Sequence, residues 1–417
     1  MTAVTSTTSG YGGYRHILTQ IAPDSLSPVT DPLDPADLLE IDRLFSPDEL
    51  ALRARVRAFV DERIRPEVEG WFAAGRFPVE LSRAFGELGV LGMHLEGDGC
   101  PGGSTVDYGL ACMEIEAGDS GLRSFMSVQG SLVMFPIHTY GSQEQKQEWL
   151  PRLASGEAIG CFALTEPGAG SDPGAMTTSA RREGGDWILD GHKRWNTNGT
   201  VSDLAVVWAR TDEGIRGFLV PSDAPGVTFL PIDDAWSLRA AARSELLLEG
   251  VRLPDGAVLP GATGLSAPLS CLTEARFGIA FGAMGAARDC FETALRHALT
   301  REQFGRPIGS FQLIQAKLAS MAVELAKGTL LALRLGRMKD GGAAGPEHVS
   351  IGKLANARAA LEIAREARAI LGGDGITSAY PVMRHMVNLE SVLTYEGTQE
   401  IQTLIVGEAL TGLRAFT

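Results

Sequence analysis

Three long helical stretches near the end of the chain constrain its fold more than any other feature. Residues 269–300 contain no proline and carry Ala, Leu, Met and Phe at helical spacing. Two further stretches follow at about 311–339 and 346–371, separated by Asp340–Gly341–Gly342. Helices of this length usually pack against each other as a bundle. The pattern predicts a C-terminal domain at residues 266–417 that is a four-helix bundle.

The middle of the chain has the pattern of a β domain. Short β-prone runs are separated by Gly, Asp and Pro, and they cover residues 187–190, 204–208, 217–220, 227–230 and 245–248. Alternating short runs and turn residues are typical of antiparallel sheets. We therefore expect a small antiparallel β domain at residues 156–265.

The first part of the chain is predicted to be helical. Ser46–Pro47–Asp48–Glu49 combines an N-cap serine, a proline at the first helical position and a capping-box glutamate. Further helices are expected around 79–88, 105–117 and 143–154. Residues 1–30 are rich in Ser, Thr, Gly and Pro without apolar periodicity, which is typical of a flexible arm. With a helical domain at 31–155, the predicted fold class is α+β, mostly α.

Composition excludes several classes of function. A formal net charge of -14 argues against nucleic-acid binding, which usually needs a basic face. The five cysteines are scattered without CxxC spacing, so we expect a reducing compartment and no metal site. Because no apolar run reaches about 18 residues and no signal peptide is evident, we predict no membrane insertion and a cytoplasmic location. A Rossmann unit is also unlikely, because no G-x-G-x-x-G follows a strand.

The stretch Tyr395–Glu396–Gly397–Thr398 is the strongest candidate for chemistry. It follows the glycine turn at 371–376 and precedes a helical pattern at 401–406. Taken alone, a glutamate at such a junction is more often a residue that compensates the helix dipole than a catalytic group. Other motifs decide between the two interpretations.

Six motifs occur in one order over some 240 residues. They are Cys161–Phe162–Ala163–Leu164–Thr165–Glu166–Pro167, Gly170–Ser171–Asp172, Trp195–Asn196–Thr197–Asn198, Arg301–Glu302–Gln303–Phe304–Gly305, the glycine turn at 371–376 and Tyr395–Glu396–Gly397–Thr398. In this order they resemble the acyl-CoA dehydrogenase family, and within it the branch that acts on glutaryl-CoA. The resemblance runs from about residue 31 to residue 416.

The resemblance implies an FAD cofactor and a reaction that removes the α-proton and β-hydride of an acyl thioester. Glu396 matches the base, and a desolvated carboxylate has the raised pKa that this task needs. Gly397 would leave room for the thioester. The residues that match the family's FAD contacts, some of them made from a neighbouring subunit, are Phe162, Ala163, Leu164, Thr165, Ser171, Trp195, Thr197, Arg301, Phe304, Gln312, Gly372, Gly373 and Thr398.

The resemblance also implies a substrate pocket. Arg123 matches an arginine that binds the distal carboxylate of a five-carbon diacid, with Glu116 in the same hydrogen-bonded cluster. A buried carboxylate needs a charge partner, and arginine offers bidentate geometry. The other residues assigned by resemblance to the acyl or CoA part are Ser124, Ser127, Ser171, Leu269, Thr273, Arg276, Tyr395, Gly397 and Phe416.

The implied reaction is oxidative decarboxylation of glutaryl-CoA to crotonyl-CoA and CO₂ by a homotetramer, with an electron-transfer flavoprotein as acceptor. Three departures leave alternatives open. Asn196 places a polar amide in the tryptophan motif, Leu122 stands where a tyrosine is usual, and Arg243 replaces a small hydroxylic residue. The main rival is a dehydrogenase of a specialised pathway that acts on another short or carboxylated acyl thioester, with or without decarboxylation. A nucleic-acid-associated relative and a catalytically silent scaffold are the remaining alternatives.

Overall fold

The computed structural model describes residues 34–415, so the predicted arm at 1–30 lies outside the described residues. The first part of the described chain is helical. Its helices are α2 (Pro47–Phe59), α3 (Val68–Ala74), α4 (Leu81–Leu88), α5 (Thr105–Gly118), α6 (Ser120–Ser127), α7 (Phe135–Tyr140) and α8 (Gln143–Ala154). The predicted capping box of α2 is present, because Ser46 Oγ accepts from the Glu49 N–H at 3.2 Å and Glu49 accepts from the Ser46 N–H at 2.8 Å.

Short irregular elements join these helices. Two π-helical turns continue α2 and α6, at Val60–Ile64 and Val128–Met134. Strands β1 (Glu96–Gly97) and β2 (Cys100–Pro101) form a small hairpin before α5. The 3₁₀ turns are Ile41–Leu44, Pro173–Ala175, Gly199–Val201, Asp255–Ala257, Ile308–Ser310 and Asp374–Ile376.

A seven-stranded sheet follows, in the spatial order β3-β6-β4-β5-β9-β8 with β7 paired to β6. Its strands are β3 (Gly160–Ala163), β4 (Ser179–Glu183), β5 (Asp186–Thr197), β6 (Leu204–Thr211), β7 (Gly214–Pro221), β8 (Val227–Pro231) and β9 (Arg243–Leu253). The sheet differs from the predicted one in one respect. Strand β3 pairs in parallel with β6, and β4 does so at a single residue pair, while the other pairings are antiparallel. Strands β3, β4 and β6 therefore run in one direction, and β5 runs opposite to them.

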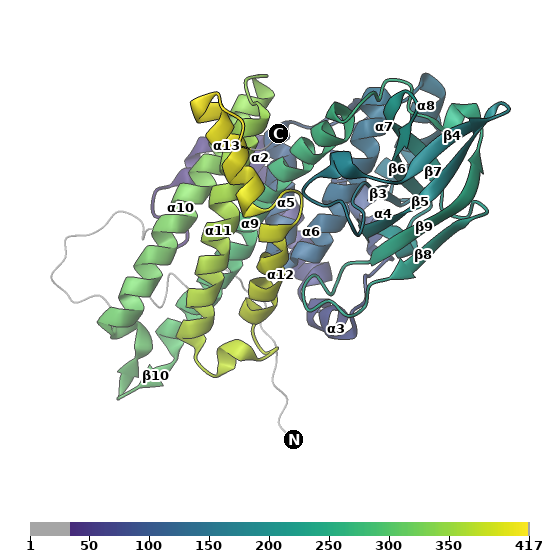
Figure 1. The fold of residues 1–417 in the computed structure, drawn as a ribbon. Helices are drawn as coiled ribbons and strands as arrows, with labels where there is room; N and C mark the ends of the chain where they lie inside the picture. Colours follow the sequence, from purple (N-terminus) through teal and green to yellow (C-terminus); the bar gives the residue numbers. More distant parts are fainter. Residues whose placement is uncertain (1–33, 416–417) are drawn as a thin grey trace.

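The C-terminal part is the predicted helical bundle. It consists of α9 (Ser266–Thr300), α10 (Gln312–Asp340), α11 (Pro346–Leu371), α12 (Val382–Thr394) and α13 (Gln399–Thr411), with the hairpin β10 (Glu302–Gln303) and β11 (Arg306–Pro307) between α9 and α10. Helix α9 begins three residues earlier than predicted, because Pro268 lies in its first turn, where proline is tolerated. Figure 1 shows these helices side by side on one side of the molecule and the sheet on the other, with α5 and α6 between them.

Helix α9 packs unusually closely on α5 because three glycines share one of its faces. A Cβ at Gly285 would lie 1.8 Å from the Met113 carbonyl oxygen, and one at Gly278 would lie 3.0 Å from Cys112 Sγ. Between them, a Cβ at Gly282 would lie 2.0 Å from Glu116 Oε2. The spacing of these glycines is that of one helix face. The two helices can therefore approach until backbone meets backbone, which brings the buried side chains of α5 against α9.

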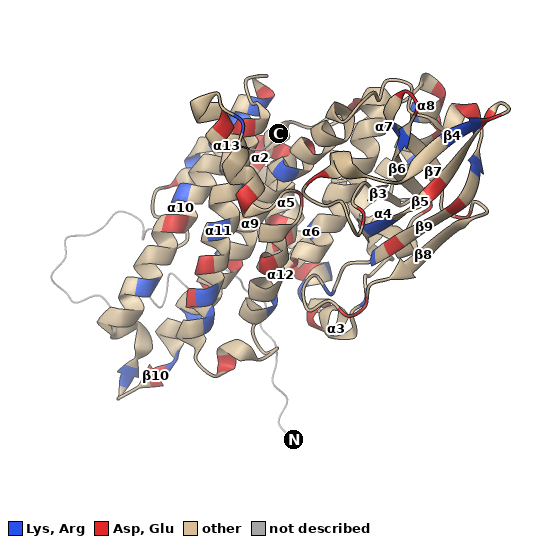
Figure 2. Ribbon diagram, viewed as in Figure 1, with Lys and Arg blue, Asp and Glu red and all other residues tan. Residues whose placement is uncertain are grey.

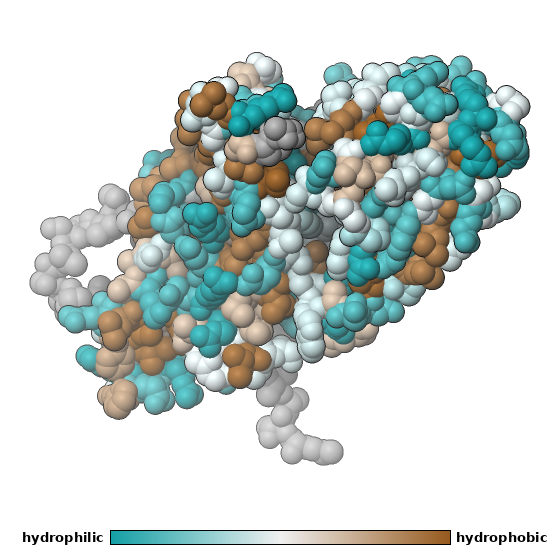
Figure 3. Space-filling view, viewed as in Figure 1, coloured by the Kyte–Doolittle hydropathy of each residue, from teal (hydrophilic) through white to brown (hydrophobic). Residues whose placement is uncertain are grey.

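The surface carries both charge signs and a concentration of apolar side chains. Figure 2 shows acidic and basic residues interspersed along α10, α11 and the sheet. Figure 3 shows hydrophobic residues gathered at the end of the bundle where β10 lies in Figure 1. Among residues 34–415, no helix has the length and apolar character needed to cross a membrane.

Replacing Gly285 by alanine tests the close packing of α9 on α5. The new Cβ meets backbone rather than a flexible side chain, and overpacking of this kind typically costs about 1–3 kcal/mol. We expect a loss of roughly 2 kcal/mol, measured as a lower midpoint of thermal unfolding. The control is Gly70→Ala on α3, where a Cβ meets no atom within 4 Å. Helix propensity should make that variant neutral or up to about 1 kcal/mol more stable. Equal midpoints for the two variants would contradict the packing argument.

Candidate active site

The stretch Tyr395–Thr398 is the loop that joins α12 to α13. Thr398 is the N-cap of α13, and its hydroxyl accepts from the Ile401 N–H at 3.4 Å. Glu396 has a φ of 52°, which lies in the left-handed region that residues other than glycine rarely adopt. Such a conformation costs on the order of 1–3 kcal/mol and persists where surrounding contacts enforce it.

Side chains from three helices enforce that conformation by binding the loop's carbonyl oxygens. Lys353 on α11 donates to the Tyr395 carbonyl at 2.6 Å and also to the Gly397 carbonyl. Arg276 on α9 donates from Nε to the Glu396 carbonyl at 2.7 Å. Gln402 on α13 donates from Nε2 to the Glu396 and Gly397 carbonyls, each at 3.1 Å. Sequence reasoning placed Arg276 among the CoA contacts and missed Lys353 and Gln402.

The same contacts give a second reason for glycine at position 397. Gly397 has a φ of +90°, and a Cβ there would lie 2.4 Å from Gln402 Nε2 and 3.1 Å from Arg276 Nη2. A larger residue would therefore displace two of the donors that bind the loop. The sequence argument explained this glycine by the room it leaves for a thioester. The structure shows that the loop's own support also requires it.

The carboxyl group of Glu396 lies in a site suited to proton abstraction. Its Oε2 is inaccessible to solvent and has no hydrogen-bond partner among residues 34–415. Burial raises the pKa of Glu396 above its usual value, and Glu116 acts in the same direction. The cations Arg123, Lys353 and Arg276 oppose that rise. A carboxylate with a raised pKa is a stronger base for an acid as weak as a thioester α-proton.

A buried ion pair lies beside Glu396. Arg123 on α6 is fully buried, and its Nε donates to Glu116 Oε2 on α5 at 2.6 Å. Its Nη2 donates to the Tyr395 hydroxyl, and the guanidinium carbon lies 5.6 Å from the centre of the tyrosine ring. Gly282 of α9 leaves the space that Glu116 occupies. The pair thus joins the Glu396 loop to α5 and α6.

Two polar atoms of this pair have no hydrogen-bond partner. Arg123 Nη1 and Glu116 Oε1 are both buried, and no acceptor or donor from the described part of the chain reaches them. An unpaired buried polar group costs about 1–3 kcal/mol, and more when it is charged. Such groups are expected where a ligand completes the hydrogen bonding. The arrangement offers one free guanidinium donor and one free carboxylate acceptor.

The remaining predicted substrate residues lie in two places. Ser124 and Ser127 are buried on α6, and Ser127 accepts from the Tyr108 hydroxyl at 3.4 Å. Leu269 and Thr273 lie on α9 before Arg276, and the Thr273 hydroxyl donates to the Leu269 carbonyl at 3.1 Å. Ser171 is exposed in the segment between β3 and β4. Phe416 lies outside the described residues.

The predicted flavin residues from the sheet lie together. Phe162 and Ala163 belong to β3, and the chain continues through Leu164 to Thr165, whose carbonyl accepts from the Arg194 N–H at 2.8 Å. This bond places Thr165 beside the end of β5, where Trp195 and Thr197 lie. The buried Lys193 fixes the same turn, because it donates to the Leu164 carbonyl and to Glu166 Oε1, both at 3.0 Å.

These residues fit an aromatic cofactor. Trp195 has a φ of 65° and is 51 % exposed, although it lies within the last residues of β5. Its indole stacks under the Arg194 guanidinium at 4.9 Å. Among residues 34–415, no hydrogen bond uses the side-chain hydroxyls of Thr165 and Thr197, so both are free to bind a ring edge. An exposed indole beside two free hydroxyls is a suitable wall for the isoalloxazine ring of FAD.

Five other predicted FAD residues lie far from this wall within one chain. Arg301 and Phe304 flank β10 and Gln312 begins α10, and Phe304 is 93 % exposed with a φ of 54°. Gly372 and Gly373 end α11 at the same end of the bundle, which Figure 1 shows far from the sheet. This separation is compatible with contacts made to a neighbouring subunit, as the resemblance implied.

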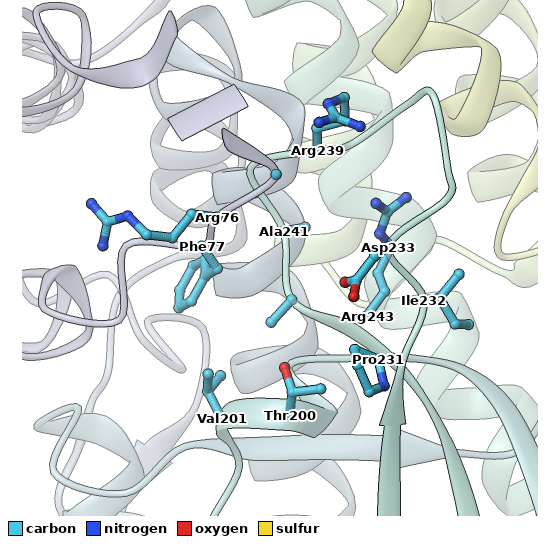
Figure 4. A pocket seen from close by; sticks show the side chains of 12 residues that line it. Arg76, Phe77, Thr200, Val201, Pro231, Ile232, Asp233, Arg239, Ala241 and Arg243 are labelled. Atoms are coloured by element: carbon cyan, nitrogen blue, oxygen red, sulfur yellow. The ribbon is translucent and has the colours of Figure 1, made fainter. Parts of the chain in front are cut away.

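The three residues that depart from the family pattern, Asn196, Leu122 and Arg243, lie in separate environments. Asn196 is buried and its amide donates to the Ser244 carbonyl of β9 at 3.2 Å. Leu122 is part of the apolar core. Arg243 donates to the Ser237 carbonyl, and its pKa is lowered by burial and by the nearby Arg239. Figure 4 shows both arginines at a cavity of about 240 Å³ between α3 and the sheet, a cavity that none of the predicted site residues lines.

Comparison with known proteins identifies the class. Family models of acyl-CoA dehydrogenases match in three parts, with the N-terminal domain at residues 46–157, the middle domain at 161–251 and the C-terminal domain at 262–411. The chain belongs to the acyl-CoA dehydrogenase family. This membership confirms the predicted family, fold class and FAD cofactor.

Individual members of the family resemble the chain to different degrees. A glutaryl-CoA dehydrogenase from Mycobacterium smegmatis, solved in complex with FADH2, is 60 % identical with a TM-score of 0.91, over 93 % of this chain and all of that chain. The butyryl-CoA dehydrogenase of Megasphaera elsdenii is 30 % identical with a TM-score of 0.85, over 88 % of this chain and 98 % of that one. The human short-chain specific acyl-CoA dehydrogenase, a mitochondrial protein, is 39 % identical over 82 % of this chain and 84 % of its own length.

The raised pKa of Glu396 predicts a pH-dependent effect on stability. A carboxyl whose pKa is higher in the folded than in the unfolded protein destabilises the fold once the pH rises above the unfolded value of 4.5. We expect Glu396→Gln to unfold at a higher temperature than the unmodified protein at pH 8, with the difference shrinking towards pH 5. The control is Glu148→Gln, at an exposed position on α8. A midpoint difference that does not depend on pH would contradict the environment described for Glu396.

Proposed function

We propose that this acyl-CoA dehydrogenase acts on glutaryl-CoA, which it oxidises and decarboxylates to crotonyl-CoA and CO₂. The observation that carries the proposal is the fully buried Arg123, whose Nη1 has no acceptor among residues 34–415. A free N–H on a buried guanidinium suits the distal carboxylate of a dicarboxylic acyl group, because Glu116 binds Nε and leaves Nη1 without an acceptor. The likeness to glutaryl-CoA dehydrogenases at 60 % identity supports the same choice.

The chain's own residues define the first chemical step. Glu396 accepts the α-proton of the thioester, and the raised pKa of its carboxyl suits that transfer. The Glu396 N–H has no acceptor among residues 34–415, so it is free to donate to the thioester carbonyl oxygen and stabilise charge that develops there. FAD, held against Trp195, Thr165 and Thr197, supplies the two-electron oxidant when bound.

The second step follows from the position of the distal carboxylate. Once the α,β double bond has formed, the bound product is glutaconyl-CoA, and its carboxylate lies one carbon beyond that double bond. The bond to CO₂ breaks, its electron pair is delocalised to the thioester carbonyl, and Glu396 returns its proton to give crotonyl-CoA. During oxidation Arg123 keeps the carboxylate in place, and Glu116 holds Arg123 through its bond to Nε. These roles of Glu396, Arg123 and Glu116 are part of the proposal.

A dehydrogenase of another short or carboxylated acyl thioester is the second candidate. Relatives named as short-chain specific acyl-CoA dehydrogenases support it, as does the apolar Leu122 beside Arg123. A straight-chain substrate would leave the buried donor of Arg123 unpaired, which disfavours that alternative.

We propose an electron-transfer flavoprotein as the electron acceptor. A solved structure from work on the electron-transferring flavoprotein of Acidaminococcus fermentans contains a chain that is 31 % identical, with a TM-score of 0.85. The half-exposed Trp195 at the proposed flavin wall leaves that side of the site open to a partner.

We also propose that the protein is a homotetramer. Large apolar side chains on the bundle are exposed in the single chain, at Phe304, Leu313, Val323, Ile376, Leu410 and Leu413. Exposed apolar side chains in such number usually mark an interface. We expect light scattering to give four times the mass of the 44.3 kDa chain. Phe304→Ser with Leu313→Ser should lower that mass and weaken FAD binding, and a monomeric unmodified protein would contradict the proposal.

The reaction is tested by anaerobic mixing with glutaryl-CoA and, separately, with butyryl-CoA. We expect glutaryl-CoA to bleach the flavin absorbance and to yield crotonyl-CoA and CO₂, identified by mass. Glu396→Gln should lower the rate of bleaching by at least about 1,000-fold, because it removes the base. Bleaching without CO₂ would support the second candidate, and no bleaching by either substrate would refute the dehydrogenase activity.

Arg123 is tested by a change in substrate preference. Arg123→Gln combined with Glu116→Gln removes both charges, so that neither remains buried without its partner. Loss of a buried charge partner typically costs about 2–5 kcal/mol, so kcat/KM for glutaryl-CoA should fall at least about 30-fold. The value for butyryl-CoA should change much less. If kcat/KM falls equally for both substrates, the Arg123–Glu116 pair is needed to fold the site and does not recognise the distal carboxylate.

A further inference from the structure

Lys353 is a buried cation that reaches the loop carrying Glu396. It lies on the inner face of α11 with 1 % of its surface exposed. Its ammonium group donates to the Tyr395 carbonyl at 2.6 Å and to the Gly397 carbonyl. These carbonyls belong to the residues on either side of Glu396. One side chain thus fixes the backbone both before and after the proposed base.

The bond to Tyr395 also sets the direction of the Glu396 N–H. In a planar trans peptide the C=O and N–H groups point in opposite directions, and residues 34–415 contain no cis peptide bond. Because the Tyr395 carbonyl points towards Lys353, the Glu396 N–H points away from α11. Within the described chain this N–H has no acceptor, so its direction decides which ligand atom it can bind.

No other side chain in the described structure can take over this role. Arg276 and Gln402 bind the carbonyls of Glu396 and Gly397 only, whereas the Tyr395 carbonyl has Lys353 as its one side-chain donor among residues 34–415. Loss of Lys353 would leave the Tyr395–Glu396 peptide free to rotate. The left-handed conformation of Glu396 makes such a rotation favourable.

We propose that Lys353 is a positioning residue for the dehydrogenation. It directs the Glu396 N–H at the thioester carbonyl oxygen, and its charge keeps the Glu396 carboxylate available as a base. The inference rests on the proposed role of Glu396.

The charge effect depends on every group that faces Glu396. Those groups come from α5, α6, α9, α11 and the loop, and they are Glu116, Cys112, Arg123, Arg276, Lys353 and Tyr395. Burial lowers the pKa of Lys353 to about 7, against the opposing effect of Glu396. Removing Lys353 takes away one of the cations that oppose the raised pKa of Glu396. That pKa then rises further, and since the base works only when ionised, the acid limb of the rate profile moves to higher pH.

The test compares Lys353→Met and Lys353→Arg in the FAD-loaded protein. Misdirecting one donor to a developing oxyanion should lower kcat by about 10- to 100-fold for Lys353→Met, with KM within about threefold. The acid limb of kcat should move up by about one pH unit. Lys353→Arg keeps the charge, so its acid limb should stay in place while kcat remains low. Lys327→Met removes a lysine that is 66 % exposed on α10 and should leave all these values unchanged.

A second readout does not depend on hydride transfer. A 3-thia acyl-CoA can lose its α-proton but has no β-hydrogen to transfer, so exchange of that proton for deuterium in D₂O reports on Glu396 and the carbonyl contact alone. We expect the exchange, followed by mass, to slow about 10-fold or more in Lys353→Met. FAD content and the midpoint of thermal unfolding show whether each variant is folded.

The outcomes separate the two proposals. If the unmodified protein oxidises no acyl-CoA, or Glu396→Gln keeps its activity, the proposed function fails. If both behave as proposed while Lys353→Met keeps the original kcat, acid limb and exchange rate, the role of Lys353 fails. If none of the variants Lys353→Met, Lys353→Arg and Lys353→Gln folds with FAD, the lysine is needed for folding. That result would also overturn the inference.

Discussion

The electrostatic balance around the Glu396 carboxyl is the interaction on which the rest of the site depends. Burial alone would keep this group neutral and useless as a base, whereas full exposure to three cations would make it too weak. Arg123, Lys353 and Arg276 reduce the effect of burial, and Glu116 offsets part of their charge. The result is a carboxyl with a raised pKa that still ionises. The proposed reaction needs both properties, because the proton is first accepted and later returned.

This balance is possible because α9 brings several helices close together. Its glycine face lets α5 approach until a Cβ at Gly285 would touch the Met113 carbonyl oxygen, and the space at Gly282 accommodates Glu116. Helix α11 packs on α9 from another direction, which brings Lys353 to the same loop as Arg276. Cations from separate helices thus converge on one carboxyl group. The electrostatics of the site therefore depend on the packing of small residues in the bundle.

The fold could be predicted from the sequence, and the sequence also supplied the candidate chemical residues, but it did not indicate the contacts that support them. The helical bundle followed from periodicity in α9, α10 and α11, and Glu396 and Arg123 followed from motifs that resemble a family. Lys353 and Gln402 carried no such signal, although a single lysine on the apolar face of α11 marks a buried cation. Which carbonyl a side chain binds depends on contacts distant in sequence, and no local pattern encodes them.

Other residues show why local patterns mislead. Asn196 neighbours the half-exposed Trp195 in sequence, yet its own side chain is buried and its amide donates to the Ser244 carbonyl of β9. Arg301 and Phe304 belong to the same family pattern as Trp195 but lie at the far end of the bundle. Residues that belong to one family pattern therefore need not lie close together within a single chain.

The unpaired polar atoms of the site carry the strongest argument that its structure is shaped by a ligand. Arg123 Nη1, Glu116 Oε1 and Glu396 Oε2 are buried without partners in the described chain, and Glu396 is held in a strained backbone conformation. Each of these features opposes folding. The close packing of α5, α9 and α11 offsets that cost, because it fixes the side chains that surround the loop. A ligand carboxylate would accept from Arg123 Nη1, whereas the free oxygen of Glu396 would accept the proton that the proposed reaction removes from the ligand. The proposed selectivity for a dicarboxylic substrate would therefore depend on how the bundle packs, and a small displacement of α9 would weaken it before the fold itself is lost.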